Sequence, residues 1–258
     1  MQVLKIPALI LILFIHPVRV FSQNHTIMQK RYCMALDLRD DATLISQYKQ
    51  VHTKEGIWPE IPKGIKECEV SDMEIYLWGN RMFMILEAPM NWDYDSQMAK
   101  MGTLERQEEW GNYVWQFQQL LPWDKKGEKW MRMENIFQLN PAGSNETAAS
   151  GYTEPVYDQL TKRFCATLDL IDNPGLISEY RKYHSPATRW PEIANGIRSV
   201  GILDMQIYLI GNRMFMIAET VPGLEWETLM QKFQQALPGT REVKWTLMEN
   251  VFDLNRDF

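Results

Sequence analysis

An internal repeat constrains the fold of this chain more than any other feature of the sequence. Residues 31–88 align with residues 163–220 without a gap, at a constant offset of 132, and 30 of these 58 positions are identical. The match resumes after a stretch around 89–108, where the first copy has extra residues, and it then pairs Trp110 with Trp226. Self-similarity at this level indicates two copies of one structural module.

The repeat and the composition between its copies divide the chain. Module 1 is expected at residues 30–140 and module 2 at residues 161–258, joined by a linker at residues 141–160 that is rich in Gly, Ser, Ala and Thr. Residues 1–23 carry a Lys before a short apolar run, which is typical of a secretory signal peptide and too short for a membrane span. We therefore expect an exported protein, periplasmic or extracellular, with no stable membrane insertion after signal cleavage. An uncleaved N-terminal anchor is the alternative.

Each module has the pattern strand, helix, strand, strand, helix, strand. Residues 32–38 alternate between two faces as a strand does, and the helix that follows is expected to be capped by Asp40 or Asp41. The βαββαβ order is that of a ferredoxin-like α+β module. The remaining elements of module 1 are expected as strands over 73–78 and 82–88, joined by a hairpin turn, a helix over 110–121 and a last strand over 131–137.

A single module of this type leaves one face of its sheet uncovered, and an apolar face of that size is unstable in water. Two modules in one chain solve this problem by packing sheet against sheet around a pseudo-two-fold axis. The expected fold class is therefore α+β, with two ferredoxin-like βαββαβ modules packed sheet to sheet as an internal pseudo-dimer. The chain itself is expected to be monomeric.

Charge and cysteine content exclude several classes of protein. The net charge of −6 gives no general attraction to phosphate backbones, so nucleic acid is not expected as a partner. Cys33 and Cys165 occupy matching strand positions, and with Cys68 they make an odd count that excludes a full disulfide framework. We expect matching buried thiols, so packing alone must hold the fold.

One set of polar and aromatic residues recurs in both modules at identical spacing. His52 follows Tyr48 by four residues, and module 2 repeats this pair as Tyr180 and His184, so each pair shares one helical face. A Trp-Pro-Glu tripeptide follows each His at the same distance. A His that titrates near neutrality beside a Tyr hydroxyl suits general acid–base chemistry on a polar ligand. The alternative is a charged His that complements the dipole at a helix end, with Tyr and Trp as packing.

The sequence contains no other catalytic pattern of note. One His per module, without an HExxH motif or paired cysteines, offers no set of metal ligands. A Gly-rich phosphate loop and a Gly-x-Ser-x-Gly elbow are also missing. We therefore expect neither a metal nor a cofactor. The matched acids Asp37 and Asp169 are expected as solvated strand residues.

Each copy resembles the L-rhamnose mutarotase family over nearly all of its length. The resemblance is carried by the Tyr-x-x-x-His pair, the Trp-Pro-Glu tripeptide, the Ile-Tyr-Leu strand and the late helix that ends at a Pro. The resemblance implies a dimeric α+β barrel, here fused into one chain. It also implies an isomerase that interconverts the α and β anomers of a monosaccharide, a deoxyhexose such as L-rhamnose, without cofactor or metal. The residues implied are His52 and His184 for proton transfer, and Tyr48, Tyr180, Trp58, Trp190, Trp110 and Trp226 for sugar binding.

Two departures from the family pattern point to a changed sugar preference, for example towards L-fucose. Met73 and Met205 stand where the family has a sugar-contacting Tyr, and the adjacent Trp pair of the family's second helix is not reproduced. Loss of activity in one copy is also consistent with these departures. Because module 1 has the extra residues, it is interpreted as more altered than module 2. The alternatives are a non-catalytic sugar-binding module and, on fold analogy alone, an oxygenase-like or haem-binding protein.

Overall fold

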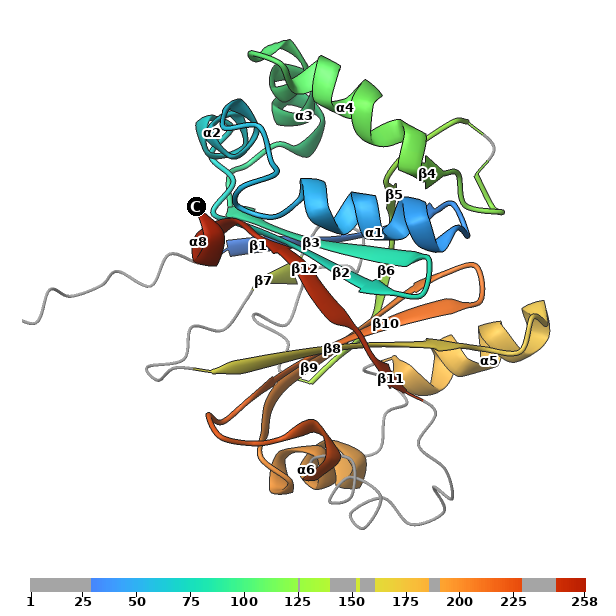
Figure 1. The fold of residues 1–258 in the computed structure, drawn as a ribbon. Coiled ribbons are helices and arrows are strands. Elements are labelled where there is room, and N and C mark those ends of the chain that lie inside the picture. The colour runs from blue at the N-terminus through green and yellow to red at the C-terminus, as the bar shows by residue number, and fades with distance from the viewer. Residues whose placement is uncertain (1–28, 125, 140–151, 154–160, 186–190, 229–244) are drawn as a thin grey trace, which may run out of the picture.

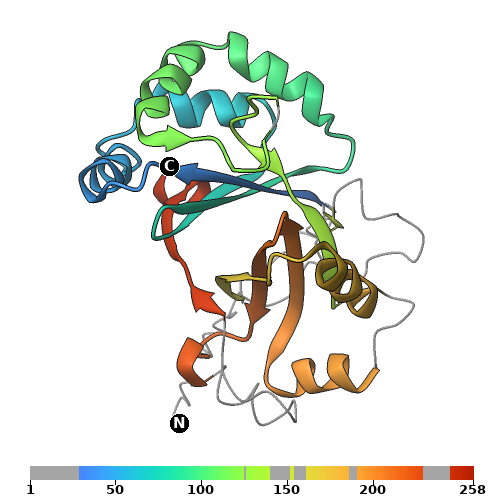
Figure 2. The ribbon, with the colours of Figure 1, turned by 90° about the vertical axis from the view of Figure 1, so that its right-hand side faces the viewer.

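The computed structural model describes residues 29–124, 126–139, 152–153, 161–185, 191–228 and 245–258. The fold is mixed α+β, with two antiparallel sheets that share a core of buried side chains (Figure 1). A view turned by 90° shows helices on the outer side of both sheets (Figure 2). The signal peptide expected at residues 1–23 and most of the linker expected at 141–160 lie outside the described residues.

The first sheet, sheet A, has the strand order β12-β2-β3-β1-β4, and β5 and β7 also pair with β1. Its strands are β1 (Gln29–Leu38), β2 (Asp72–Trp78), β3 (Arg81–Pro89), β4 (Gln118–Gln119), β5 (Met131–Arg132), β7 (Tyr152–Thr153) and β12 (Glu249–Asp253). Sheet B has the order β11-β8-β10-β9-β6. Its strands are β6 (Glu134–Gln138), β8 (Lys162–Asp169), β9 (Ile202–Ile210), β10 (Arg213–Thr220) and β11 (Thr246–Leu247).

Helices cover the outer face of each sheet. The first one begins after Asp41, whose side chain accepts hydrogen bonds from the backbone N–H groups of Thr43 and Leu44, as the sequence predicts. No helix in the described ranges is long and apolar enough to cross a membrane. The helices are α1 (Ala42–Val51), α2 (Glu60–Glu67), α3 (Tyr94–Thr103), α4 (Gln107–Val114), the 3₁₀ turn η1 (Trp115–Phe117), α5 (Pro174–His184), α6 (Pro191–Ser199) and α8 (Leu254–Asp257).

Strand β1 is buried on both faces, because helices cover one side of sheet A and sheet B covers the other. Met34, Leu36 and Leu38 belong to the core beneath the helices of module 1. Cys33 and Ala35 belong to the core between the two sheets. The alternation predicted for residues 32–38 is therefore confirmed, with both sets of side chains buried.

The core between the sheets is built around a pair of equivalent residues. Phe83 stacks on Phe215, its counterpart in module 2, with ring centroids 4.6 Å apart and ring planes 4° apart. A residue that stacks on its own counterpart lies at the axis that relates the two copies. Cys33 and Cys165 are free and buried in this same core. The prediction of matching buried thiols is confirmed.

The last strand of each module crosses to the other sheet. β5 pairs with β1 of its own module, and the N–H of Met133 then donates to the carbonyl of Cys33. Beyond Met133 the chain leaves sheet A, and β6 pairs with β9 in sheet B. Module 2 does the reverse, because β11 pairs with β8 and β12, red in Figure 1, pairs with β2. Each sheet therefore ends in a strand from the other module.

The helix predicted over residues 110–121 is wrong in its bounds. α4 starts earlier, at Gln107, and ends at Val114, before the short 3₁₀ turn. Gln118 and Gln119 then form β4, which pairs with the end of β1. A strand of two residues is too short to show a period of two. The apolar pattern of the flanking residues therefore favoured a helix here.

Asp37 is buried, which corrects the expectation of a solvated strand residue. It forms an ion pair with Arg213, from the hairpin of module 2, at 2.5 Å. Asp169 forms the equivalent ion pair with Arg81 at 2.6 Å and is exposed, as expected. Each module is thus tied through its first strand to the hairpin of the other module. The Arg that pairs with Asp37 belongs to the other module. The strand pattern of one module therefore predicts a solvent-exposed Asp37.

Candidate active site

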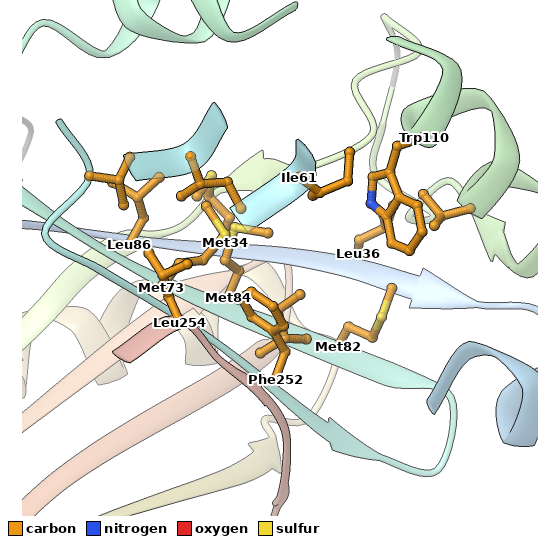
Figure 3. Packing of buried hydrophobic residues seen from close by; sticks show 14 of the residues in the cluster. Met34, Leu36, Ile61, Met73, Met82, Met84, Leu86, Trp110, Phe252 and Leu254 are labelled. Carbon is orange, nitrogen blue, oxygen red and sulfur yellow. The ribbon is translucent and has the colours of Figure 1, made fainter. Parts of the chain in front are cut away.

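A cavity of about 200 Å³ lies between sheet A and the helices of module 1. It is several times the roughly 30 Å³ share of one water molecule, and smaller than the roughly 300–1,000 Å³ of pockets for drug-sized ligands. The apolar lining, part of which Figure 3 shows, consists of Met34, Met73, Met84, Met98, Met101, Ile57, Ile61, Ile65, Ile75, Val114, Trp110, Trp130 and Phe252. The polar side chains of the lining are Tyr48, His52, Tyr94, Gln107, Gln118 and Lys129.

His52 and Tyr48 lie together at the end of α1 and line this cavity. Their rings are 4.0 Å apart between centroids. Nδ1 of His52 lies 2.8 Å from the backbone carbonyl oxygen of Tyr48. Because a carbonyl only accepts, Nδ1 carries the ring proton and donates, and Nε2 of the neutral ring keeps its lone pair.

Burial keeps the His52 imidazole neutral. It lowers the pKa of His52 from 6.5 to about 4, against the smaller effect of the hydrogen bond to the Tyr48 carbonyl. A neutral ring does not complement a helix dipole as an imidazolium would. The interpretation of His52 as a charged helix cap is therefore disfavoured.

Gln118 is a polar residue of the cavity that the sequence analysis did not single out. Burial raises the pKa of the Tyr48 hydroxyl, and a hydrogen bond with the Gln118 side chain partly opposes this effect. Gln118 is itself buried, with 3% of its surface exposed. The Phe-Gln-Gln triplet that both modules share is the sequence signal for this position, but its apolar neighbours favour a helix rather than a strand.

Trp110 of α4 is an aromatic wall of the cavity. Its ring lies edge-on to that of His52, 5.4 Å away between centroids. Trp58 packs against Trp110 at 5.2 Å, outside the cavity lining, and the guanidinium of Arg106 lies 3.8 Å from the Trp58 ring centre. The structure therefore brings Tyr48, His52 and Trp110 to one cavity and places Trp58 one layer behind them.

Helix α3 forms a wall that the sequence analysis did not assign to the site. Tyr94, Met98 and Met101 line the cavity from this helix. The hydroxyl of Tyr94 donates to Sδ of Met34 at 3.2 Å, which joins the helix to β1. The extra residues of module 1, around 89–108, thus build part of the cavity.

Phe252 reaches the same cavity from module 2. It lies on β12 and belongs to the buried cluster that includes Met82 and Met84 of β3 (Figure 3). Its ring is edge-on to His52, at 6.2 Å between centroids and 87° between planes. The two residues are 200 positions apart in the chain, so no local pattern predicts the contact.

Tyr180 and His184 repeat the local arrangement in module 2. Their rings are 3.9 Å apart, and Nδ1 of His184 lies 2.8 Å from the carbonyl oxygen of Tyr180. Burial lowers the pKa of His184 and raises the pKa of Tyr180 to about 12. Phe137 of β6, the counterpart of Phe252, lies 5.9 Å from the His184 ring. Trp190 lies outside the described residues.

Trp226 does not take the position that its alignment with Trp110 predicts. Its ring packs on Phe164 at 5.6 Å. Phe164 is the counterpart of Tyr32, and Tyr32 packs on Trp92 at the same distance of 5.6 Å. Trp226 therefore stands in the place of Trp92, which corrects the alignment. Its role in sugar binding stays a prediction.

Three carboxylates, of Asp72, Glu74 and Asp253, lie near one another outside the cavity lining. Glu74 forms an ion pair with Arg163 at 2.5 Å, and Asp253 caps α8. Burial, with the neighbouring acids, raises the pKa of Asp72 to about 7. Arg163 and the backbone N–H groups of α8 therefore meet the charges of Glu74 and Asp253, whereas the charged form of Asp72 stays unfavourable.

Comparisons with known proteins fit the two-module organisation. A model of the L-rhamnose mutarotase family matches residues 31–139 and 163–254, which together make up more than half of the chain. An L-fucose mutarotase of Xanthomonas campestris pv. campestris is 34% identical over 115 residues, which cover 45% of this chain and 92% of that relative. An L-rhamnose mutarotase of Burkholderia ambifaria is 32% identical over 96 residues, which cover 32% of this chain and 89% of that relative. Each relative thus corresponds in length to about one module.

Proposed function

This chain belongs to the L-rhamnose mutarotase family, and we propose that it interconverts the α and β anomers of a deoxyhexose such as L-rhamnose or L-fucose. The proposed site is the cavity of module 1, with His52 as the proton-transfer residue. One observation carries the proposal. His52 and Tyr48 line one buried, largely apolar cavity, and the hydrogen bond from Nδ1 of His52 to the Tyr48 carbonyl leaves Nε2 as the proton acceptor of the ring.

Anomer exchange requires the sugar ring to open and to close again. In this scheme Nε2 of His52 takes the proton of the anomeric hydroxyl, the bond between C1 and the ring oxygen breaks, and C1 becomes an aldehyde. The ring oxygen keeps the electron pair of that bond and receives the proton back from the imidazolium. After rotation about the C1–C2 bond, the same steps in reverse close the ring as the other anomer. A positioned His accelerates proton transfers of this kind by about 10²–10⁴.

Tyr48, Gln118 and Trp110 hold the sugar in this scheme. Because burial raises the pKa of Tyr48, its hydroxyl stays protonated and remains a hydrogen-bond donor. The side chain of Gln118 hydrogen-bonds this hydroxyl and fixes its direction. The indole of Trp110 provides an apolar surface for the C–H side of the sugar ring.

The cavity walls favour a deoxyhexose over the parent hexose. Tyr94 and Gln107 line the cavity, but their donors already bind Sδ of Met34 and the carbonyls of Glu60 and Ile61, so Lys129, which also binds the Gly111 carbonyl, is the remaining donor of these three. A sugar hydroxyl that is buried without a partner costs about 1–3 kcal/mol. A methyl group instead packs well against methionine side chains. The substrate that fits is therefore a hexose with a methyl group in place of its C6 hydroxymethyl group.

Saturation-transfer NMR between the two anomers tests this proposal. We expect faster exchange with L-rhamnose, L-fucose or both, and at least about tenfold less acceleration with L-mannose and L-galactose, which differ from them only by the C6 hydroxyl. A tenfold ratio corresponds to about 1.4 kcal/mol, within the cost of one unpaired hydroxyl. Equal acceleration of both groups would overturn the deoxyhexose preference. Binding without faster exchange would favour the alternative, a non-catalytic sugar-binding module.

A further inference from the structure

Module 2 is 17 residues shorter than module 1 between the strand pair β3/β10 and the strand pair β5/β11, and 16 of these 17 fall before the Phe-Gln-Gln triplet that both modules share. The residue numbers of matched positions differ by 132 up to the ends of β3 and β10. From β5 and β11 onwards they differ by 115. In module 1 this stretch contains α3 and leads into α4. The difference between the modules therefore falls on the layer that covers the cavity.

The extra stretch of module 1 contributes directly to the cavity. Tyr94, Met98 and Met101 of α3 line it, and Tyr94 is hydrogen-bonded to Met34 on the opposite wall. The counterpart of Met34 in module 2 is Ala166, a much smaller side chain. Module 2 has 17 fewer residues over the matched stretch, so its sequence has no counterpart for a continuous part of the stretch that forms α3 and α4 in module 1.

The described part of module 2 differs at two of its candidate site residues. Trp226 packs on Phe164, in the place that Trp92 has in module 1, rather than beside the imidazole as Trp110 does. His184 is only partly buried, whereas His52 has 5% of its surface exposed. Among the described residues, the Tyr–His pair of module 2 therefore has Phe137 beside its imidazole, but no Trp in the place of Trp110.

Module 2 nevertheless contributes to the cavity of module 1. Strand β12 crosses into sheet A and brings Phe252 into the lining, edge-on to His52. The rings packed on His52 are those of Tyr48, Trp110 and Phe252, and only the Tyr titrates, far above neutral pH. Phe252 therefore helps to hold the imidazole in position and to keep water away from it.

We propose that the chain has one working sugar site, in module 1, and that module 2 acts as a built-in partner subunit whose Phe252 positions His52. This replaces the expectation that module 1 is the more altered copy. The catalytic part of this inference rests on the proposed function. The number of sugars bound per chain tests the single site independently of catalysis.

The matched residues Phe252 and Phe137 give the central comparison. We expect Phe252→Ala to slow anomer exchange by about 10²-fold, the effect of a small displacement of a catalytic group. Phe137→Ala removes the equivalent ring beside His184. We expect its exchange rate to stay within about twofold of the wild type. Thermal melting shows whether each variant folds. If Phe252→Ala does not fold, Phe252→Leu, which keeps most of the apolar volume, replaces it. Equal losses from the two Phe→Ala variants would overturn the inference, as would loss of half the exchange in His184→Ala.

A pH–rate profile separates positioning from a general loss of structure. Removal of the Phe252 ring admits water to His52, so the acid limb of the profile is expected to move from about pH 4 towards 6.5. The same limb in Phe137→Ala is expected to stay in place. An unshifted limb in a folded Phe252→Ala chain would contradict the positioning role.

Titration calorimetry with L-fucose and L-rhamnose counts the sites. One sugar per chain in the wild type and in Phe137→Ala supports the inference, and two sugars per chain overturn it. If the wild type binds one sugar without accelerating exchange, the proposed function fails and the single composite site stands. Absence of any binding overturns both.

Discussion

At the scale of single residues, burial acts in opposite directions on His52 and Asp72. It lowers the pKa of His52 to about 4, because the uncharged form of imidazole is the deprotonated one. It raises the pKa of Asp72 to about 7, because the uncharged form of a carboxyl group is the protonated one. His52 therefore destabilises the fold as the pH falls from 6.5 to 4, whereas Asp72 destabilises it as the pH rises from 4 to 7.

Substitution of Asp72 tests the second of these effects. Between about pH 4 and pH 7 the folded chain holds the Asp72 proton and the unfolded chain does not, so stability falls as pH rises. Asp72→Asn removes this penalty and keeps an oxygen that accepts from the N–H of Met73. We expect the melting temperature at pH 8 to rise by about 2–4 °C, the shift for about 1 kcal/mol in a chain of this size. The shift is small because solvent screens the charge of the partly exposed Asp72 side chain.

The control for this prediction is Asp40→Asn, at an exposed position before α1. We expect it to change the melting temperature equally at pH 4 and pH 8, whereas the benefit of Asp72→Asn disappears at pH 4. An Asp72→Asn chain that melts at or below the wild-type temperature at pH 8 would show that the carboxylate carries no net penalty.

Residues close in the chain were the predictable part of the site. Tyr48 and His52 share a helical face at a four-residue spacing, so the sequence alone placed them together, and the structure has them 4.0 Å apart. Gln118 and Phe252 lie on strands that contact His52 or Tyr48 only after the chain has folded. Their roles depend on strand pairing, which a local pattern does not contain.

At the scale of elements, α2 and α4 are joined through Gly64 and Gln107. Nε2 of Gln107 donates to the carbonyls of Glu60 and Ile61 at 3.0 and 3.2 Å. A Cβ atom on Gly64 would lie 2.2 Å from that nitrogen, so α2 accepts only glycine here while Gln107 keeps its place. This contact sets the distance between two helices that both line the cavity.

Gly64→Ala is therefore expected to destabilise the fold. Displacement of Gln107 breaks two hydrogen bonds, at a cost of about 1–3 kcal/mol, and the better helix propensity of Ala returns about 1 kcal/mol at most. We expect a net loss of about 1–2 kcal/mol in urea unfolding. Gly102→Ala in α3, where a Cβ meets nothing within 4 Å among the described atoms, is the matched control and is expected to be neutral or slightly stabilising. A Gly64→Ala chain as stable as the wild type would contradict this account of the helix contact.

Elements with a clear period were predicted well, and short ones were not. The strands at 73–78 and 82–88 appear as β2 and β3, joined by a turn in which Gly79 has a φ of +58°. The helix predicted over 110–121 ends early because Gln118 and Gln119 pair with Leu38 and Asp37 of β1. Tertiary pairing overrode an apolar pattern that is compatible with a helix.

At the scale of the whole molecule, the two modules depend on each other. Each sheet ends in a strand of the other module, and the ion pairs Asp37–Arg213 and Arg81–Asp169 join the first strand of one module to the hairpin of the other. The repeat predicted two modules that pack together, and the stacked Phe83 and Phe215 bear this out. The exchange of the last strands was not predictable, because the same strand satisfies the same backbone hydrogen bonds at an edge of either sheet.

The most direct test of the whole account is anomer exchange in wild-type protein and in His52→Ala, measured by saturation-transfer NMR with L-fucose and L-rhamnose at neutral pH. We expect the wild-type chain to exchange the anomers of at least one of these sugars faster than buffer alone does. We also expect a folded His52→Ala chain to lose about 10²-fold or more of that acceleration. A folded His52→Ala chain that exchanges the anomers as fast as the wild type would contradict the proposed role of His52.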